Sequence, residues 1–380
     1  LLKDFVEEKQ IAKLSSFLGK PFTPGDVFLF IEESKIKIKV TYDEFLDALI
    51  ASSVKIQEAE HGEGFWTDHW HYNLDLIESY LGLYPEKLKE LFFEKKVFTF
   101  YDNTEGVRPR QEKYLLKEGC VRQLHSVTHD FAKKEIIRKR AHAPHTVRQG
   151  YGKGEIYYTS LFNKLLCLLA NKLSSLDPFG CGIEMEADKP NWFDALNGLP
   201  ALCGSSLCET FELKRLIQLV KDALEKAKIE KIYVTEEIQI FLTGLDDLIR
   251  KYSAQDAPDK GYLYWDKSHS LKEDYRHKTR FGFSGRELEL ETKSLTAILD
   301  NALAKVAQGI EKSKNKKENI YYAYFINEVS EYKSLNEHFV MPTKFTQKRL
   351  PFFLEAQMHA LRLSQNTNEA RALYNATRLS

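Results

Sequence analysis

The chain has 380 residues and a mass of 44.1 kDa, and its 55 Lys+Arg are balanced by 55 Asp+Glu. This balance excludes a nucleic-acid-binding protein that acts through a strongly basic face, and it excludes a polybasic membrane binder. Hydrophobic residues make up 43% and charged residues 29% of the sequence, as in a folded rather than a disordered protein. A chain of this length buries a large core without disulfides or metals.

The two ends of the sequence indicate what kind of polypeptide this is, and the cysteines indicate its compartment. No apolar run reaches the ~18 residues that span a bilayer. The start, LLKDFVEEKQ, lacks Met and a signal-peptide layout, and the end stops within a helical pattern, so we expect a piece of a longer polypeptide. No C-x-x-C pair and no zinc spacing with histidine occurs, so we expect no metal and free thiols in a reducing cytoplasm. The five cysteines are Cys120, Cys167, Cys181, Cys203 and Cys208.

The first 40 residues differ in pattern from the rest. They contain the strand-like runs DVFLF and KIKIKV beside the turn dipeptide Pro24-Gly25, which predicts a short β-rich entry segment over 1–40. Thr41 and Glu44 then have the spacing of a capping box, and helical apolar spacing follows. We therefore expect a second, mainly helical domain over 41–380.

Helical patterns recur along this second domain. Ser206 and Glu209 form another capping-box spacing, followed by apolar residues at 213, 216, 217 and 220. The stretch 97–116 alternates aromatic and β-branched residues and predicts a hairpin or long excursion. Helices in this number, joined by long loops, favour a toroid or solenoid. Helices are predicted around 41–50, 74–81, 155–173, 206–220, 235–248, 288–310, 321–336 and 351–379.

An aromatic and acidic segment, 63–73, is the first candidate site. Aromatic rings stack on the apolar face of a sugar ring, and acids handle hydroxyls and protons. The alternative is an ordinary helix entrance, with Thr67 or Asp68 as the N-cap and tryptophans in the core. Its candidate residues are Asp68 as an acid and Trp66, Trp70, His71 and Asn73 as sugar-binding groups.

A second acidic segment, 180–200, lies in a loop punctuated by Gly and Pro. Glu184 and Glu186, two residues apart, face the same way on an extended chain. A general acid needs a carboxyl held protonated near neutral pH, which burial or a nearby like charge provides. The alternative is a solvated acidic loop in which Asp194 caps the next helix. The candidates are Glu184, Glu186 and Asp194 as catalytic acids, with Asp188, Trp192 and Asn197 binding substrate.

Small residues lie at the start of the helix predicted around 206–220. Ser205 and Ser206 at a helix N-terminus are a speculative phosphate site, although plain N-capping by Ser206 is the simpler interpretation. The glycine-rich stretch 148–155 lacks the P-loop spacing, because Gly154 rather than Ser or Thr follows Lys153. The basic stretch 133–148 contains no aromatic ring, so we interpret it as a solvated face rather than a nucleic-acid patch.

Three segments together resemble large bacterial proteins grouped with cellobiose phosphorylases and related glycoside hydrolases. They are EGFWTDHWHYNLDLIESYL, EMEADKPNWFDALNGLPALCGSSLCETFELKRL and RLPFFLEAQMHALRL, with the strongest similarity over residues 60–220. The resemblance implies an (α/α)6 toroid, here an incomplete one, with the cleft at one mouth. It also implies inverting cleavage of a β-linked oligosaccharide, and it makes the 1–40 segment the remnant of an N-terminal sandwich domain.

Two chemical outcomes remain open for such an enzyme. An inverting hydrolase needs an acid and a base ~6.5–9.5 Å apart, whereas an inverting phosphorylase needs only the acid and uses inorganic phosphate as co-substrate. No other cofactor is expected. The expected partners are an oligosaccharide and either the remaining domains of the polypeptide or a second copy of the chain. The alternatives are a non-catalytic carbohydrate-binding or structural domain of a larger enzyme and a helical-repeat interaction module.

Overall fold

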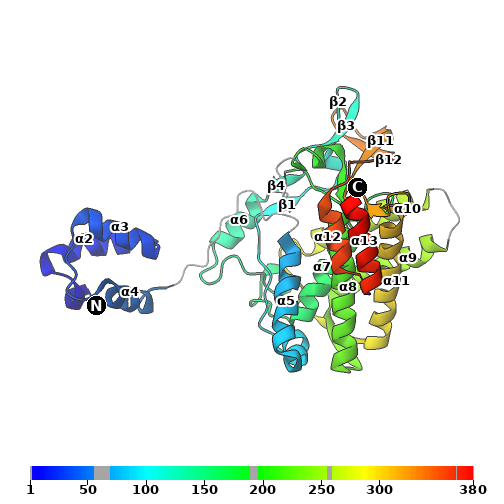
Figure 1. Cartoon of the computed structure of the whole chain (residues 1–380). Helices are drawn as coiled ribbons and strands as arrows, with labels where there is room; N and C mark the ends of the chain where they lie inside the picture. Colours follow the sequence, from blue (N-terminus) through cyan, green and yellow to red (C-terminus); the bar gives the residue numbers. More distant parts are fainter. Residues whose placement is uncertain (1, 55–68, 189–195, 255–258, 365, 380) are drawn as a thin grey trace. The chain divides into compact units, whose positions relative to one another are not determined.

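A computed structural model describes residues 2–54, 69–188, 196–254, 259–364 and 366–379 (Figure 1). The chain divides into two compact units, Leu1–Glu60 and His61–Ser380. This division differs from the boundary predicted after residue 40, because the helix that follows Thr41 belongs to the first unit. The described part of the chain is mostly helical, as predicted, with small sheets.

Over the described residues 2–54, the first unit is built from four helices and not from strands. They are α1 (Leu2–Phe5), α2 (Glu8–Leu18), α3 (Pro24–Ser34) and α4 (Tyr42–Ala51). Their inward faces form one apolar core, whose fully buried members include Val6, Leu14, Val27 and Phe45. The capping box predicted at Thr41 is confirmed, since its side chain accepts from the Glu44 N–H and Glu44 bonds back to the Thr41 N–H.

The β-rich segment predicted over 1–40 is therefore wrong. The run DVFLF lies inside α3, where Pro24 occupies the first turn and Thr23 forms a capping box with Asp26. These local start signals outweigh the β propensity of Val and Phe, because the helix also buries Val27 and Ile31 on one face. The run KIKIKV makes a single bridge, between Ile38 and Val6.

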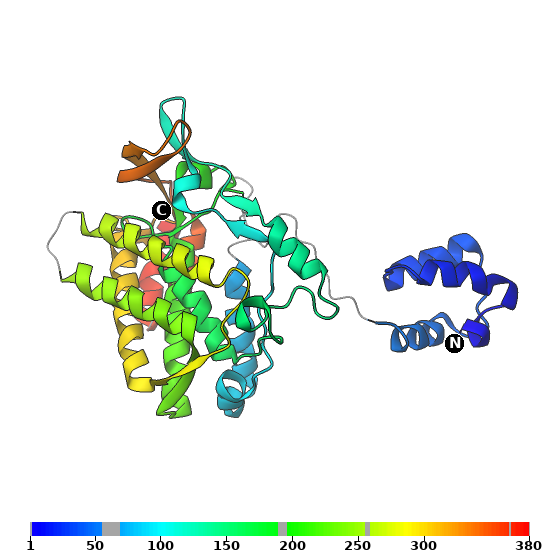
Figure 2. The same cartoon turned by 180° about the vertical axis from the view of Figure 1, so that it is seen from behind.

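Long helices make up most of the second unit and lie side by side (Figures 1 and 2). Among them, α8 packs on α7, α11 and α12, and α9 packs on α7, α10 and α11. The helices are α5 (Tyr72–Leu83), α6 (Phe131–Arg138), α7 (Leu161–Leu173), α8 (Leu207–Ala227), α9 (Glu236–Ser253), α10 (Lys260–Lys278), α11 (Thr292–Lys312), α12 (Leu354–Arg362) and α13 (Thr367–Leu379). Short helical turns occur at His69–His71, Pro85–Lys87, Glu90–Glu94, Arg110–Glu112, Gly150–Gly152 and Pro200–Leu202.

Helix α8 shows why this sequence folds in this way. Ser206 is its N-cap, and the side chains of Leu213, Leu216, Ile217 and Val220 are fully buried in the main core. This is the apolar stripe predicted from the sequence. Close contacts also fix neighbouring segments: a Cβ atom added at Gly309 of α11 would overlap the carbonyl oxygen of Gly180.

The strands form small antiparallel sheets; β11 and β12 lie near the start of α8, whereas β7 and β8 lie near its end (Figures 1 and 2). The largest sheet has the order β12–β11–β6–β5 and joins segments far apart in sequence. The other pairings are β1 with β4, β2 with β3, β7 with β8 and β9 with β10. The strands are β1 (Glu105–Val107), β2 (Tyr114–Lys117), β3 (Cys120–Gln123), β4 (Val127–His129), β5 (Ile183–Glu184), β6 (Gly204–Ser206), β7 (Lys231–Thr235), β8 (Glu287–Glu291), β9 (Lys314–Asn315), β10 (Ile320–Tyr321), β11 (Tyr324–Ser334) and β12 (Val340–Arg349).

Of two predictions about the second unit, one needs correction and the other left two alternatives open. Residues 321–336, predicted as a helix, form β10 and β11, because β11 pairs with β6 on one side and β12 on the other. For residues 97–116, predicted as a hairpin or a long excursion, the structure has an excursion with the short strand β1 and the turn Arg110–Glu112, and the hairpin follows where β2 joins β3 at Tyr114–Gln123.

All five cysteines are free thiols, as predicted. In the described part of the chain, each helix is too short or too polar to cross a membrane.

Candidate functional site

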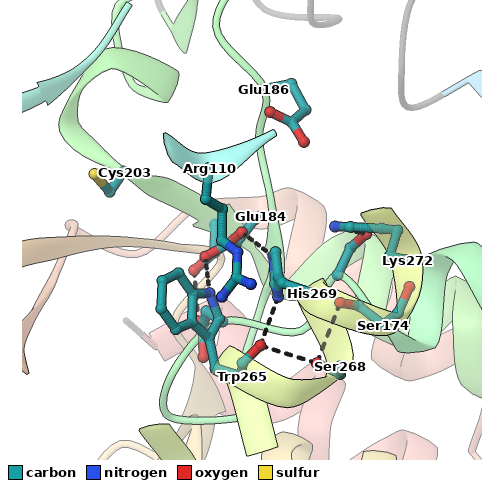
Figure 3. Close-up of polar contacts among 12 residues, drawn as sticks. Arg110, Ser174, Glu184, Glu186, Cys203, Trp265, Ser268, His269 and Lys272 are labelled. Atoms are coloured by element: carbon teal, nitrogen blue, oxygen red, sulfur yellow. Dashed lines mark hydrogen bonds and ion pairs between the residues drawn. The ribbon is translucent and has the colours of Figure 1, made fainter. Parts of the chain in front are cut away.

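A cluster of buried polar side chains lies between the β5 segment and helix α10 (Figure 3). We call it the Glu184 cluster. Helix α10 supplies Trp265, His269 and Lys272, whose exposed fractions are 0–2%. The strand segment 183–187 supplies the two acids predicted to act together, and residues 110–113 supply two cations. Its members are Arg110, Lys113, Glu184, Glu186, Trp265, His269 and Lys272.

The Glu184 carboxyl is held by two side chains of α10. The Trp265 indole N–H donates to Glu184 Oε1 at 2.5 Å, and His269 Nε2 lies 2.7 Å from Glu184 Oε2. The Glu184 side chain is 8% exposed. His269 is oriented by its other nitrogen, Nδ1, which lies 2.9 Å from the Trp265 carbonyl oxygen. A carbonyl oxygen only accepts, so His269 Nδ1 carries a hydrogen.

The surroundings of this contact shift the pKa of both groups. Burial lowers the pKa of His269 well below 6.5, and the neighbouring cations lower it further. Burial raises the pKa of Glu184, against the opposing effect of Lys272 and Lys113. Both shifts favour the uncharged form of the group concerned, and a neutral His269 with its hydrogen on Nδ1 presents a lone pair at Nε2 to Glu184.

Glu186 has the opposite environment. Its Oε2 accepts from Lys113 Nζ at 2.6 Å. Burial alone would raise the pKa of Glu186, but the charges of Lys113, Lys272 and Arg276 lower it to about 2. Burial also lowers the pKa of Lys272 to about 7, and Arg276 contributes in the same direction. The pKa values of two acids on one segment are thus shifted in opposite directions, which is the pattern of acid and base partners.

Arg110 fixes helix α10 against this cluster. Its side chain is 2% exposed and donates to Asp266 at 2.8 Å, to Glu273 at 3.0 Å and to Ser270 at 2.8 Å. Its guanidinium also lies 5.3 Å from the centre of the Trp265 ring. The position of the Trp265 donor therefore depends on Arg110.

A cavity of about 760 Å³ is lined by Glu273 and Arg276 of α10, but by none of the seven residues of the Glu184 cluster. Its size is that of a small-ligand site. Asp130 pairs with Arg280 in its wall, and Glu105 pairs with His129. Its ionisable lining is mixed in sign, with three acids, three Lys or Arg residues and two histidines. These residues are Glu105, His129, Asp130, Lys133, Glu273, Arg276, His277 and Arg280.

Two residues predicted for sugar binding, Trp70 and Asn73, line a different cavity of about 710 Å³. Most of its wall is apolar and comes from α5 and α7. The Trp70 indole N–H donates to Glu209 at 3.2 Å, and Lys172 Nζ lies 5.2 Å from the Trp70 ring. His71 packs instead on the ring of His359, with centroids 5.9 Å apart.

The two serines predicted as a phosphate site are buried within β6. The Ser205 hydroxyl donates to the buried Asp177 carboxylate at 2.6 Å, and Ser206 accepts from the Glu209 N–H as the N-cap of α8. Capping by Ser206 is therefore confirmed. An acidic neighbour such as Asp177 opposes a phosphate anion at Ser205.

The remaining predicted residues are not joined to the Glu184 cluster by any contact found among the described residues. Asp188 is exposed and accepts from the Val127 N–H at 3.4 Å, and Asn197 is exposed. Trp66, Asp68, Trp192 and Asp194 lie outside the described residues.

Sequence reasoning missed the contribution of helix α10. Trp265, Ser268, His269 and Lys272 stand at i, i+3, i+4 and i+7, which is the spacing of a core-facing stripe. Three polar residues at these positions, all buried in the structure, are the signal that was available. The sequence around Arg110 and Lys113 has no such spacing that would have predicted these two residues as members of the cluster.

No protein-family model matches this chain, and no curated protein matches its sequence.

Proposed function

We propose that this chain is the catalytic part of a carbohydrate-active enzyme that cleaves β-linked oligosaccharides with inversion, on an (α/α)6-type helical toroid. The observation that carries the proposal is the pair Glu184 and Glu186, two largely buried carboxyl groups two residues apart, one held by Trp265 and His269 with a raised pKa and the other held by Lys113 with a lowered pKa. Glycoside cleavage by inversion requires this division of labour between two carboxyl groups.

Glu184 is the general acid in this scheme. It donates its proton to the glycosidic oxygen as the bond from that oxygen to the anomeric carbon breaks. Afterwards the carboxylate accepts from the Trp265 N–H and recovers a proton from solvent. His269 holds the carboxyl in place before the transfer.

Glu186 is the general base. It takes a proton from the water that attacks the anomeric carbon on the opposite face, so that the product has inverted configuration. Residues two apart on an extended chain have Cα atoms about 6.6–6.8 Å apart. This backbone spacing is compatible with the separation of about 6.5–9.5 Å that inverting enzymes use between carboxyl groups.

The test is turnover of β-linked gluco-oligosaccharides by the whole chain and by its Glu184→Gln and Glu186→Gln variants. Each substitution should lower turnover about 10²–10⁴-fold, the usual contribution of a positioned acid or base. The control is Glu331→Gln on β11, whose side chain is 61% exposed and pairs with Lys344. It should leave turnover unchanged.

A second substrate separates the two roles from a loss of structure. An aryl β-glycoside with a dinitrophenolate leaving group needs no proton from the enzyme. Glu184→Gln should therefore cleave it at nearly the wild-type rate, whereas Glu186→Gln should not. Equal losses on both substrates in the Glu184 variant would contradict its role as acid.

A second candidate is phosphorolysis, in which Arg276 in the wall of the 760 Å³ cavity would offer a cation to phosphate. Phosphate would then replace the attacking water, and Glu186 would not be needed as a base. Sugar 1-phosphate formed only when phosphate is added would establish this reaction. Sugar binding without turnover under both conditions would establish the non-catalytic domain instead.

A further inference from the structure

Away from the Glu184 cluster, three potential metal ligands converge where the start of α8 meets α12. Cys208, Glu355 and His359 each offer one ligand atom, and these atoms all lie within 4.8 Å of one another. Cys208 is buried, and the other two side chains are half-buried, so an ion has a route from solvent. We call these three residues the Cys208 cluster.

The local folds explain why these ligands meet. Glu355 and His359 are four residues apart on α12, so they project from the same face of that helix. Cys208 is the second residue of α8. Helices α8 and α12 pack directly on each other, which brings the thiol to the acid and imidazole.

The orientation of His359 is that of a metal ligand. Its Nδ1 lies 2.7 Å from Glu212 Oε1, and Glu212 is held in turn by Arg215 at 2.9 Å. His359 therefore donates through Nδ1 and keeps Nε2 as its free donor atom for a cation. In zinc sites, a histidine that binds the metal through one ring nitrogen usually donates the N–H of the other to a carboxylate or a carbonyl.

The charge around Glu355 also calls for a cation. Its carboxylate accepts from the Tyr324 hydroxyl. Among the described residues, no Lys, Arg or His forms an ion pair with Glu355, whereas Glu186 and Glu212 are each paired with a Lys or an Arg. A divalent ion between Glu355 and Cys208 would balance the carboxylate and the thiolate together.

We propose that Cys208, Glu355 and His359 bind one Zn²⁺ ion, with solvent in the fourth position. One thiolate, one imidazole and one carboxylate match the mixed ligands of Zn²⁺ and do not suit Mg²⁺ or Ca²⁺, which prefer oxygen alone. Tetrahedral zinc with bonds of about 2.0–2.3 Å places its ligand atoms roughly 3–4 Å apart, so small side-chain movements close the site. On binding, the Cys208 S–H loses its proton to solvent as the S–Zn bond forms. The ion would clamp α12 to the start of α8.

The test uses Co²⁺ as a spectroscopic probe on the whole, reduced chain after chelator dialysis. One equivalent of Co²⁺ should produce the thiolate-to-cobalt charge-transfer band, and Zn²⁺ should abolish it. Cys208→Ser should lose the band. The matched control is Cys203→Ser, which changes another buried cysteine outside the cluster and should keep it. No band at millimolar Co²⁺, or a band that survives in Cys208→Ser, would overturn the proposal.

Two further variants keep the test valid if Cys208→Ser does not fold. Glu355→Gln retains an acceptor for Tyr324, and it should weaken Co²⁺ binding at least about 10-fold. Glu212→Gln acts through His359 and should weaken it by about 10–100-fold, as outer partners of zinc ligands do. Unchanged affinity in both variants would also overturn the site. Added Zn²⁺ should raise the melting temperature of the wild-type chain but not that of Glu355→Gln.

Discussion

Replacing Arg110 by Met tests whether helix α10 is held to the Glu184 cluster by one buried cation. The substitution keeps most of the aliphatic stem and removes every charged hydrogen bond. It leaves the Glu273 carboxylate without its cation and the Asp266 carboxylate with Lys267 alone, and these two side chains are 19% and 26% exposed. It also removes the guanidinium that stacks 5.3 Å from Trp265.

The expected loss can be estimated from this environment. Breaking a buried ion pair by removing one partner costs about 3–5 kcal/mol. The two acids keep some contact with solvent, so we expect the lower end, about 3 kcal/mol. For a folding unit the size of His61–Ser380, 1 kcal/mol corresponds to roughly 1.5 °C. The melting temperature of this unit should therefore fall by about 4–5 °C.

The assay is thermal unfolding followed by circular dichroism, with Arg138→Met as the control. Arg138 is 69% exposed and pairs with Glu135 at i, i+3 on α6. Surface pairs of this kind contribute about 0–1 kcal/mol, so the control should hardly change the melting temperature. Equal melting temperatures for the two variants would refute the anchoring role of Arg110.

Three further predictions concern other parts of the chain. Gly309→Ala should lower the melting temperature strongly, because the added Cβ would overlap the carbonyl oxygen of Gly180. Gly82→Ala lies in open space on α5 and should instead raise the free energy of unfolding by up to about 1 kcal/mol. Thermal unfolding of both variants checks this, and similar shifts would contradict it. Thr23→Ala removes a capping box and should destabilise the first unit by about 1 kcal/mol, measured by urea unfolding; no change would mean that the cap is not needed. The raised pKa of Glu184 means that its stabilising contribution is complete below the unfolded pKa of about 4.3 and is lost as pH rises through the folded value. The wild type should therefore lose stability relative to Glu184→Gln between pH 4 and neutrality, and parallel pH curves would contradict a raised pKa.

Local signals allowed the sequence to predict some elements well. The caps at Thr41 and Ser206 and the apolar stripe of α8 involve residues within a few positions of one another, and all are present. The helix predicted over 321–336 was wrong because β11 is stabilised by β6 and β12, which are distant in sequence. Over 1–40, short alternating runs were given more weight than the Thr23 capping box that begins α3.

The contrast between local signals and contacts from distant segments also applies to the sites. Glu184 and Glu186 were predicted to face the same way, and both carboxyl groups respond to Lys113 and Lys272. Their partners on α10 and near Arg110 are more than 70 residues away in sequence, so no local spacing reveals them. The Cys208 cluster was missed for a related reason. Only the i, i+4 pair Glu355 and His359 is local, and the third ligand comes from another helix.

The measurement that tests the central claim most directly is the anomeric configuration of the first sugar released from a β-linked gluco-oligosaccharide, followed by proton NMR from the start of the reaction. The account predicts the α anomer, as free sugar when water attacks or as the 1-phosphate when phosphate attacks, with the signal lost in Glu184→Gln. A β anomer as the first product, or α-anomer formation that is unchanged in Glu184→Gln, would contradict inverting cleavage with Glu184 as the acid.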